Sequence, residues 1–203
     1  MAKGFTDQEK KQITDQLIRE GKRLFSTYGV KKTSIGQLTK AVGIAQGSFY
    51  QFFSSKEVLF FEILEIEEAA IKQKLMDEFD LQNITKQSFK EMLLYSLELI
   101  EEHPIVKSLF YQEDVEQIIR KLPPEVIEEH IKRDEDVLDP FIQLWQTKGI
   151  LVNKDPQVIT GTVRAFFTML LHKKEIGEDV YPMVVDLLAE SLAEGLISEE
   201  DDL

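Results

Sequence analysis

The fold is decided by the stretch Thr33–Lys56, TSIGQLTKAVGIAQGSFYQFFSSK. Ser34 and Gln37 stand three residues apart, in the spacing of a capping box, which predicts that a helix begins at Ser34. The side of this helix that we expect to be buried consists of Ile35, Leu38, Ala41 and Val42. Gly43 predicts a tight turn, and a second short helix is expected over about Ala45–Phe52. Two short helices around a glycine-containing turn form a helix-turn-helix motif.

The second short helix has one polar side and one aromatic side. The polar side consists of Gln46, Gly47, Ser48 and Gln51. The apolar anchors are expected to be Phe49 and either Phe52 or Phe53. A slim face with hydrogen-bonding groups can enter the major groove of DNA, about 12 Å wide, where a glutamine can pair with N6 and N7 of adenine. A glycine inside so short a helix costs about 1 kcal/mol relative to alanine, so Gly47 indicates the close approach of another group.

Residues 10–60 resemble the tetracycline-repressor (TetR) family of transcription regulators. The positions that carry the resemblance are Thr33, Gly43, Gly47, Tyr50, Phe53 and Lys56. The resemblance implies that Thr33, Tyr50 and Lys56 hold the DNA backbone, and that the polar side of the second short helix reads base edges. Ala45 departs from the family pattern, since many relatives have a serine or threonine there whose hydroxyl caps the helix and touches a phosphate.

Charge is unevenly distributed along the chain. The formal net charge is −13, which by itself argues against nucleic acid as a partner. Residues 1–56, however, contain ten Lys and Arg against four Asp and Glu, a net charge of +6, whereas residues 57–203 contain fourteen against thirty-three, a net charge of −19. A basic end on an acidic body is expected when one end meets phosphates and the other does not.

The whole chain is predicted to be all-α, with about nine helices. The first helix should begin at Thr6, which forms a capping box with Glu9, and should end at Gly29. Its expected apolar side is Ile13, Leu17, Leu24, Phe25 and Tyr28. After the motif, a helix capped by Ser54 or Ser55 should reach about Phe79. The later helices are expected at Lys86–Glu102, Val106–Lys121, Pro124–Thr147, Pro156–His172 and Tyr181–Gly195.

We expect two domains, a helix-turn-helix domain over residues 1–56 and a helical effector-binding and dimerisation domain over residues 57–203. The resemblance implies a homodimer in which the last two helices of each subunit form a four-helix bundle. Residues 158–171 carry a single charge, and faces this apolar suit burial both in a core and in a subunit interface. The expected interface residues are Val158, Thr162, Phe166, Val184, Leu188 and Leu192. A core helix buried in a monomer is the alternative.

The resemblance also implies a cavity for a small-molecule effector. The candidate lining residues are Phe89, Met92, Tyr95, Phe110, Tyr111, Phe141, Trp145, Arg164, Phe166 and Met169. Aromatic and soft side chains suit an apolar or aromatic ligand, although each of them can equally belong to a plain core. Arg164, a lone cation in an apolar helix, is expected to pair with a carboxylate or with an anionic ligand.

These patterns favour a dimeric repressor on a palindromic double-stranded DNA operator, released by a small, largely apolar effector. The alternative is a DNA-binding regulator without a small-molecule effector, controlled by a protein partner or acting as an activator. No nucleophile–base pair or phosphate loop indicates an enzyme, and no cofactor is expected.

The remaining signals exclude several other classes. No metal is expected, because His103, His130 and His172 lack the spacing of zinc ligands. Glu101, Glu102 and His103 together indicate a solvated face. Without cysteine, signal peptide or membrane span, the chain is expected to be cytoplasmic.

Overall fold

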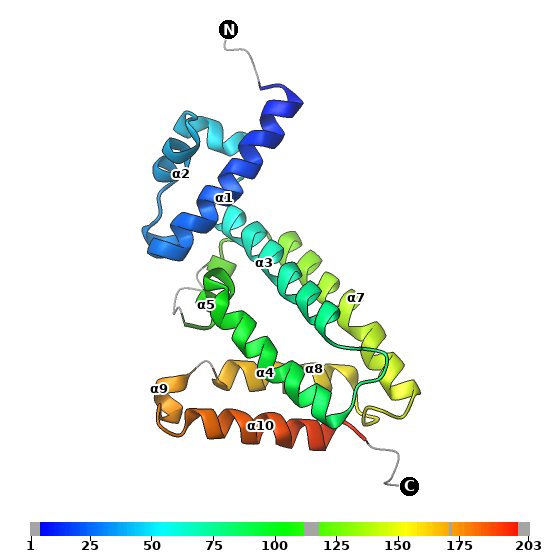
Figure 1. Cartoon of the computed structure of the whole chain (residues 1–203). Coiled ribbons are helices and arrows are strands. Elements are labelled where there is room, and N and C mark those ends of the chain that lie inside the picture. Colours follow the sequence, from blue (N-terminus) through cyan, green and yellow to red (C-terminus); the bar gives the residue numbers. More distant parts are fainter. Residues whose placement is uncertain (1–4, 112–117, 171, 199–203) are drawn as a thin grey trace. The chain divides into compact units, whose positions relative to one another are not determined.

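The computed structural model describes residues 5–111, 118–170 and 172–198, with the backbone alone at 109–111 and 131–139. Its helices, drawn in Figure 1, are α1 (Asp7–Lys32), α2 (Ile35–Val42), the 3₁₀ helix η1 (Gln46–Gln51), α3 (Lys56–Glu78), α4 (Lys86–Glu102), α5 (Pro104–Tyr111), α7 (Pro124–Thr147), α8 (Pro156–Leu170), α9 (Lys173–Ile176) and α10 (Tyr181–Leu196). Within the described residues, extended chain pairs only at an isolated bridge between Leu151 and Ile197. The prediction of an all-α fold is confirmed.

The chain forms two compact units. The first unit consists of residues 1–69 and 103–123, and the second of residues 70–102 and 124–203. The long helix α3 contributes its first part to the first unit and its last part to the second. The division expected after residue 56 therefore falls at the first residue of a continuous helix, and it stays a prediction about function.

In the first unit, α1 begins where its local signal places it. The Oγ of Thr6 accepts a hydrogen bond from the N–H of Glu9 at 3.3 Å, and the Glu9 carboxylate accepts one from the N–H of Thr6 at 2.7 Å. At Gly29 the backbone takes a φ of 77°, which ends the regular helix before a last turn reaches Lys32. Tyr28 is 52% exposed rather than buried, since its ring ends in a hydroxyl that water can bind.

Helices α1 and α3 approach each other closely at Gly21. A methyl group added at Gly21 would lie 2.8 Å from Cδ1 of Ile63 and 3.2 Å from Cδ2 of Leu59. Nearby, the rings of Phe25 and Phe60 meet edge to face with their centroids 5.7 Å apart. The absence of a side chain at Gly21 therefore lets α1 pack directly on α3.

The same unit contains a buried carboxylate, Glu67, with two partners. The Oε1 of Glu67 accepts a hydrogen bond from Nζ of Lys22 at 2.5 Å, and its Oε2 lies 2.8 Å from Nδ1 of His103. Burial alone raises the pKa of the Glu67 carboxyl. The hydrogen bonds and charges of Lys22 and His103 together outweigh that effect, so the pKa lies below its ordinary value. The sequence assigned His103 to a solvated face, but the fold turns it toward Glu67.

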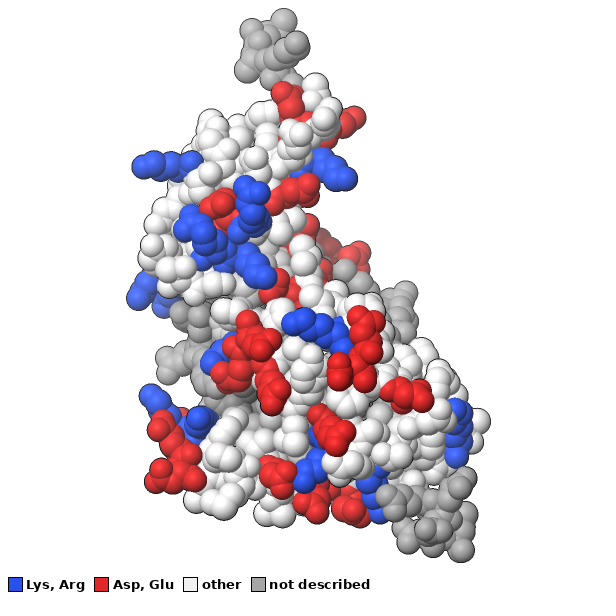
Figure 2. Space-filling model, in the orientation of Figure 1, with Lys and Arg blue, Asp and Glu red and all other residues white. Residues whose placement is uncertain are grey.

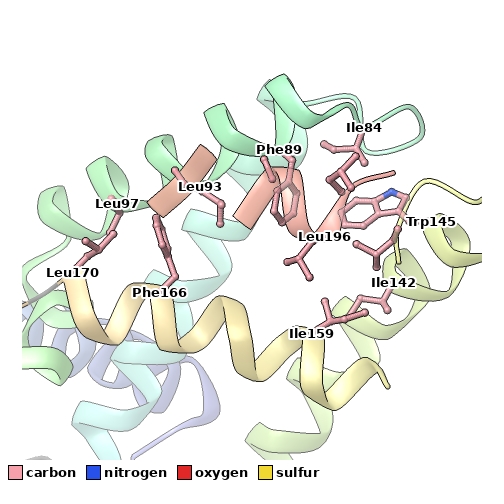
Figure 3. Packing of buried hydrophobic residues seen from close by; sticks show 14 residues of the cluster. Ile84, Phe89, Leu93, Leu97, Ile142, Trp145, Ile159, Phe166, Leu170 and Leu196 are labelled. Carbon is pink, nitrogen blue, oxygen red and sulfur yellow. The ribbon is translucent and has the colours of Figure 1, made fainter. Parts of the chain in front are cut away.

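The second unit is built around a core between α4, α7, α8 and α10. Figure 3 shows Leu93 and Leu97 of α4 on the side of Phe166 and Leu170 of α8, and Phe89 of α4 close to Leu196 of α10. The small residues of α10 in this core are Ala189 and Ala193, both buried. Because they carry only a methyl group, α10 can pack closely on α4. The helical spacing of apolar residues in the sequence thus produces a hydrophobic core in this unit.

Ion pairs and backbone contacts fasten this core at its edges. Lys90 of α4 lies 2.8 Å from Asp186 and 3.3 Å from Glu190 of α10. At the start of α4, the indole Nε1 of Trp145 donates to the carbonyl of Leu81 at 2.7 Å. The connection between α3 and α4 is thereby tied to α7.

Several helix boundaries differ from the predictions. The expected helix at Val106–Lys121 begins earlier, at Pro104, and α5 ends at Tyr111, before the undescribed residues 112–117. The last residue of α8 is Leu170 rather than His172, and the short helix α9 was not predicted. No helix in the described part of the chain has the length and hydropathy required to cross a membrane.

The buried side of α2 also differs from the predicted one. Ala41 is exposed, and Thr39 is buried instead, at 2% exposure. The burial of Thr39 costs little because its hydroxyl donates to the carbonyl of Ile35 at 2.9 Å. Helix α2 therefore packs inward through Leu38 and Thr39.

Candidate nucleic-acid interface

Helix α2 and the turn after it are fixed by local hydrogen bonds. The Oγ of Ser34 accepts from the N–H of Gln37 at 3.2 Å, and the Gln37 side chain accepts from the N–H of Ser34 at 2.8 Å. Gly43 has a φ of 81°, a left-handed conformation that ends α2. The N–H groups of Gly43 and Ile44 both donate to the carbonyl of Thr39. The chain therefore leaves α2 in a single defined direction toward η1.

Two aromatic side chains anchor η1 in the first unit. Phe49 is completely buried and Phe53 is 4% exposed, and their ring centroids lie 5.9 Å apart. Either Phe52 or Phe53 was expected as the second apolar anchor, and the burial of Phe53 shows that it is Phe53. Because both rings point inward, the opposite side of η1 is turned to solvent.

The solvent side of η1 carries the polar residues that the sequence singled out. Gln46, Gly47 and Gln51 are exposed, Tyr50 is 61% exposed, and Ser48 is partly buried. These side chains are therefore available to a partner outside the chain.

The side-chain position of Gly47 faces open space among the described residues. A methyl group added at Gly47 would have no neighbour within 4 Å among the described residues, and its backbone φ is not positive. Neither packing inside the protein nor backbone strain therefore requires a glycine at this position. The close approach of a partner to this backbone stays a prediction.

Lys56 and Thr33 direct their polar groups inward. The Nζ of Lys56 donates to the carbonyls of Val30 at 2.7 Å, Thr33 at 2.7 Å and Lys31 at 3.2 Å. Burial lowers the pKa of the Lys56 ammonium, and the charge of Lys121 adds to this while that of Glu57 opposes it.

Thr33 is 1% exposed, and its hydroxyl donates to the carbonyl of Gly29 at 2.8 Å. Both residues thus hold the end of α1 against the start of α3, a role that the sequence pattern did not reveal. The contacts of Thr33 and Lys56 with a DNA backbone stay predictions.

The residue before η1 provides no capping side chain, as the sequence indicated. Ala45 occupies the cap position in an extended conformation and provides no side-chain hydrogen bond. The N–H of Ser48 instead donates to the carbonyl of Ala45 at 2.9 Å. The start of η1 therefore depends on backbone bonds and on its buried rings.

Exposed basic residues surround this region. On the face shown in Figure 2, Lys and Arg side chains gather over α1 and α2. The exposed basic residues of α1 and α2 are Lys10, Lys11, Arg19, Lys22, Arg23, Lys31, Lys32 and Lys40.

In the described part of the chain, no group of three His, Cys, Asp or Glu residues could hold a metal ion.

Residues 17–63 match the model of a known protein family, described as bacterial regulatory proteins of the tetR family. The chain is 39% identical over 66 residues to the HTH-type transcriptional regulator AcrR of Shigella flexneri. It is 37% identical over 57 residues to the HTH-type transcriptional regulator QacR of Staphylococcus aureus (strain Mu50 / ATCC 700699). Over residues 17–63, the chain is therefore similar to the regulators of the tetR family.

The matched stretches cover 32% and 28% of this chain, and 31% and 30% of the two relatives, so the chain spans about a third of their length. Solved structures extend the similarity of fold to the rest. A TetR-family regulator from Pectobacterium atrosepticum gives a TM-score of 0.68 at 18% identity, covering 96% of this chain and 99% of that one. A TetR-family regulator from Haemophilus influenzae gives 0.60 at 16% identity, covering 94% and 100%.

The residues proposed from the TetR resemblance to line an effector cavity are only partly brought together in the described structure. Phe89, Trp145 and Phe166 are buried in the core of the second unit. Met92 and Phe141 are partly buried against that core, and Tyr95 stacks on Phe79 with centroids 6.1 Å apart. Arg164 and Met169 are exposed on α8, and the side chains of Phe110 and Tyr111 lie outside the described residues. A cavity lined by part of this set stays a prediction.

The residues proposed for a TetR-type subunit interface also differ in their exposure to solvent. Val158 is 59% exposed, and Thr162, Val184, Leu188 and Leu192 are partly buried. Phe166, at 2% exposure, points into the core of its own unit and is not available to a second subunit. The apolar residues most exposed on α8, on α10 and just before α10 are Val158, Met169, Val180, Met183 and Leu187. Only the first of these was in the predicted set, because spacing alone does not say which side of an apolar helix the core covers.

Proposed function

We propose that the chain is a sequence-specific DNA-binding transcription regulator. The observation that carries this proposal is the arrangement of η1, which buries Phe49 and Phe53 and leaves Gln46, Gly47 and Gln51 exposed. A rigidly anchored helix with a slim polar side fits the major groove of duplex DNA. The TetR match over residues 17–63 supports the same role.

Each exposed group has a chemical task in this proposal. The amides of Gln46 and Gln51 read base edges, for which adenine N6 and N7 are the matching pair. The hydroxyl of Tyr50 donates to a phosphate, and Gly47 lets the backbone of η1 approach the groove. The exposed Lys and Arg residues of α1 and α2 attract the phosphates without reading sequence.

A binding-site selection on random duplex DNA tests the proposal. We expect one sequence to be enriched, and Gln46→Ala and Gln51→Ala to weaken its binding by about tenfold, with a smaller effect on unselected DNA. Tyr50→Phe should weaken binding by a similar factor on all sequences. Gln12→Ala, which removes an exposed amide from α1, is the matched control and should bind like the wild type. Selection that enriches no sequence would contradict sequence-specific binding.

We further propose that the regulator is a homodimer joined through α8 and α10, and that it binds a palindromic operator. The exposed residues Val158 and Met169 of α8 and Met183 and Leu187 of α10 support this, since apolar side chains so exposed gain from burial against a second copy. Gly161, in the middle of α8, is exposed and has no neighbour within 4 Å of an added methyl group, so it permits close approach of another helix.

A two-fold dimer would place two η1 helices about 34–36 Å apart, on successive major grooves. Leu187→Glu places a charge on the proposed interface without disturbing the core of the subunit, since Leu187 is 64% exposed. We expect light scattering to give half the wild-type mass for this variant. Met76→Glu, on a residue of α3 that is 38% exposed, should leave the mass unchanged. A wild-type mass equal to one chain would contradict the proposal.

We also propose that the regulator is a repressor released by a small, largely apolar effector bound in the second unit. Phe141 and Trp145 support this, because their centroids lie 6.2 Å apart and Phe141 is only partly buried. Trp145 is the single tryptophan, so its fluorescence reports on ligands near it.

Titration with apolar aromatic compounds should change the fluorescence emission of Trp145. The same compounds should weaken the binding of the protein to its operator. Emission changes without any effect on operator binding would favour the alternative, a regulator controlled by a protein partner or acting as an activator.

A further inference from the structure

We propose that Phe5 is a positioning residue for the recognition helix η1, a role that rests on the proposed DNA-binding function. The ring of Phe5 packs on the ring of Phe52 with centroids 5.7 Å apart and an interplanar angle of 48°. Both residues are partly buried. Phe52 is the residue that ends η1, and its N–H donates to the carbonyl of Phe49 at 2.9 Å.

The start of α1 holds Phe5 in place. Thr6 is tied to Glu9 by the capping box described above, so the residue directly before Thr6 leaves the helix in a fixed direction. In a hydrophobic staple, an apolar residue at this position packs on the residue four places into the helix. That residue here is Lys10, which is exposed and charged. The ring of Phe5 therefore packs across the fold on Phe52.

The 3₁₀ helix depends on such external support. Its described backbone bonds at the two ends are Ser48 to Ala45 and Phe52 to Phe49, each about 2.9 Å. A six-residue 3₁₀ helix has weaker hydrogen-bond geometry than an α-helix and is long for its type. Phe49 and Phe53 hold η1 from the core, and Phe5 holds its last residue from the N-terminal side.

The position of Phe5 places this contact outside the shared family pattern. The family match begins at residue 17, whereas Phe5 and the capping box precede it. Loss of the ring frees Phe52 and lets the end of η1, where Tyr50 and Gln51 lie, move relative to the groove. Contacts with base edges need accurate placement, while diffuse attraction to phosphates does not.

The test is a double-mutant cycle with Phe5→Ala, Phe52→Ala and the pair, measured on the selected operator and on unselected duplex DNA. We expect Phe5→Ala to weaken operator binding about five- to tenfold, the size of one lost aromatic pair, and to change binding to unselected DNA less than about twofold. The double variant should bind no more weakly than Phe52→Ala alone. Phe5→Tyr keeps the ring and should restore operator binding.

The matched control is Phe79→Ala, which removes a partly buried ring stacked on Tyr95 in the second unit. It should not change the ratio of operator to unselected binding. Wild-type operator binding by Phe5→Ala, additive losses in the cycle, or equal losses on both kinds of DNA would each overturn the positioning role alone. A wild-type chain that binds no duplex would overturn the proposed function and this role together.

Discussion

The polar residues around the turn divide by where their hydrogen-bonding atoms point. Gln46 and Gln51 are exposed, whereas the ammonium of Lys56 lies on three carbonyls of the segment from Val30 to Thr33. The exposed amides can serve a partner without any loss to the fold. Lys56 cannot leave its carbonyls without leaving them unpaired. Stability and the proposed DNA binding should therefore be separable at single residues.

Lys56→Met should lower the free energy of unfolding by about 1–2 kcal/mol, because charged hydrogen bonds to partly buried carbonyls are lost. Urea unfolding measures this loss. A contact of Lys56 with a DNA phosphate can be recognised from the dependence of DNA affinity on salt. A lysine that holds a phosphate contributes about one unit to the slope of log affinity against log salt concentration. A slope reduced by about one unit in Lys56→Met would support the predicted contact with a phosphate, and an unchanged slope would contradict it. Lys40→Met, an exposed lysine of α2, should leave the unfolding free energy unchanged.

Gly47→Ala should weaken DNA binding without a loss of stability. The added methyl group meets no atom within 4 Å, so unfolding free energy should stay the same or rise by up to about 1 kcal/mol. Operator affinity should fall about tenfold, because the methyl group occupies the space between η1 and the groove. Calorimetry and fluorescence anisotropy on the same preparation provide the two measurements. Unchanged affinity would leave Gly47 without a role in DNA contact.

Among the glycines of the described helices, Gly21 makes the closest contact with a neighbouring helix, at the point where α1 packs on α3. The methyl group of an alanine at Gly21 would already lie 2.8 Å from Ile63, closer than van der Waals contact allows. This contact matters for function because α1 carries basic residues and, through the segment ending at Thr33, leads into α2. The spacing of these helices therefore sets where η1 stands in the first unit.

Gly21→Val should lower the free energy of unfolding by about 1–3 kcal/mol, the usual cost of overpacking a filled core. Thermal unfolding followed by circular dichroism checks this. Gly195→Ala is the control, because Gly195 lies in α10 with no neighbour within 4 Å of an added methyl group. It should leave stability equal or slightly higher. A fully stable Gly21→Val variant would mean that α1 can shift without cost.

At the scale of the whole molecule, residues 1–56 have a net positive charge and residues 57–203 a net negative charge, and the described residues include the buried carboxylates of Glu57 and Glu67. The most enclosed charged group of the first unit described above is Glu67, held by Lys22 and His103. Its environment lowers the pKa of the carboxyl below 4.5, its ordinary value. Stability from this group is therefore present at pH values above the ordinary carboxyl pKa, and it is lost as the pH falls through the lowered pKa.

Glu67→Gln should therefore flatten the acid side of the stability curve. We expect the wild type to lose unfolding free energy below about pH 4.5 more steeply than the variant, and the variant to be less stable near pH 7. Urea unfolding between pH 3 and pH 7 gives both curves. Parallel curves for the two proteins would show that another carboxylate dominates acid unfolding.

The sequence by itself determined the local elements of this protein. The capping pairs Thr6 with Glu9 and Ser34 with Gln37, and the left-handed Gly43, were predictable because each interaction joins residues close in the chain. The polar side of η1 was predictable for the same reason, since helical spacing assigns residues to sides.

Only the tertiary structure decided the partners that lie far apart in sequence. Lys56 reaches the carbonyl of Val30 across 26 positions, and Glu67 reaches His103 across 36. It also decided that Phe166 enters the core while Leu187 stays exposed. Hydrophobic spacing marks which residues are apolar, but the packing of neighbouring helices selects which apolar side is covered.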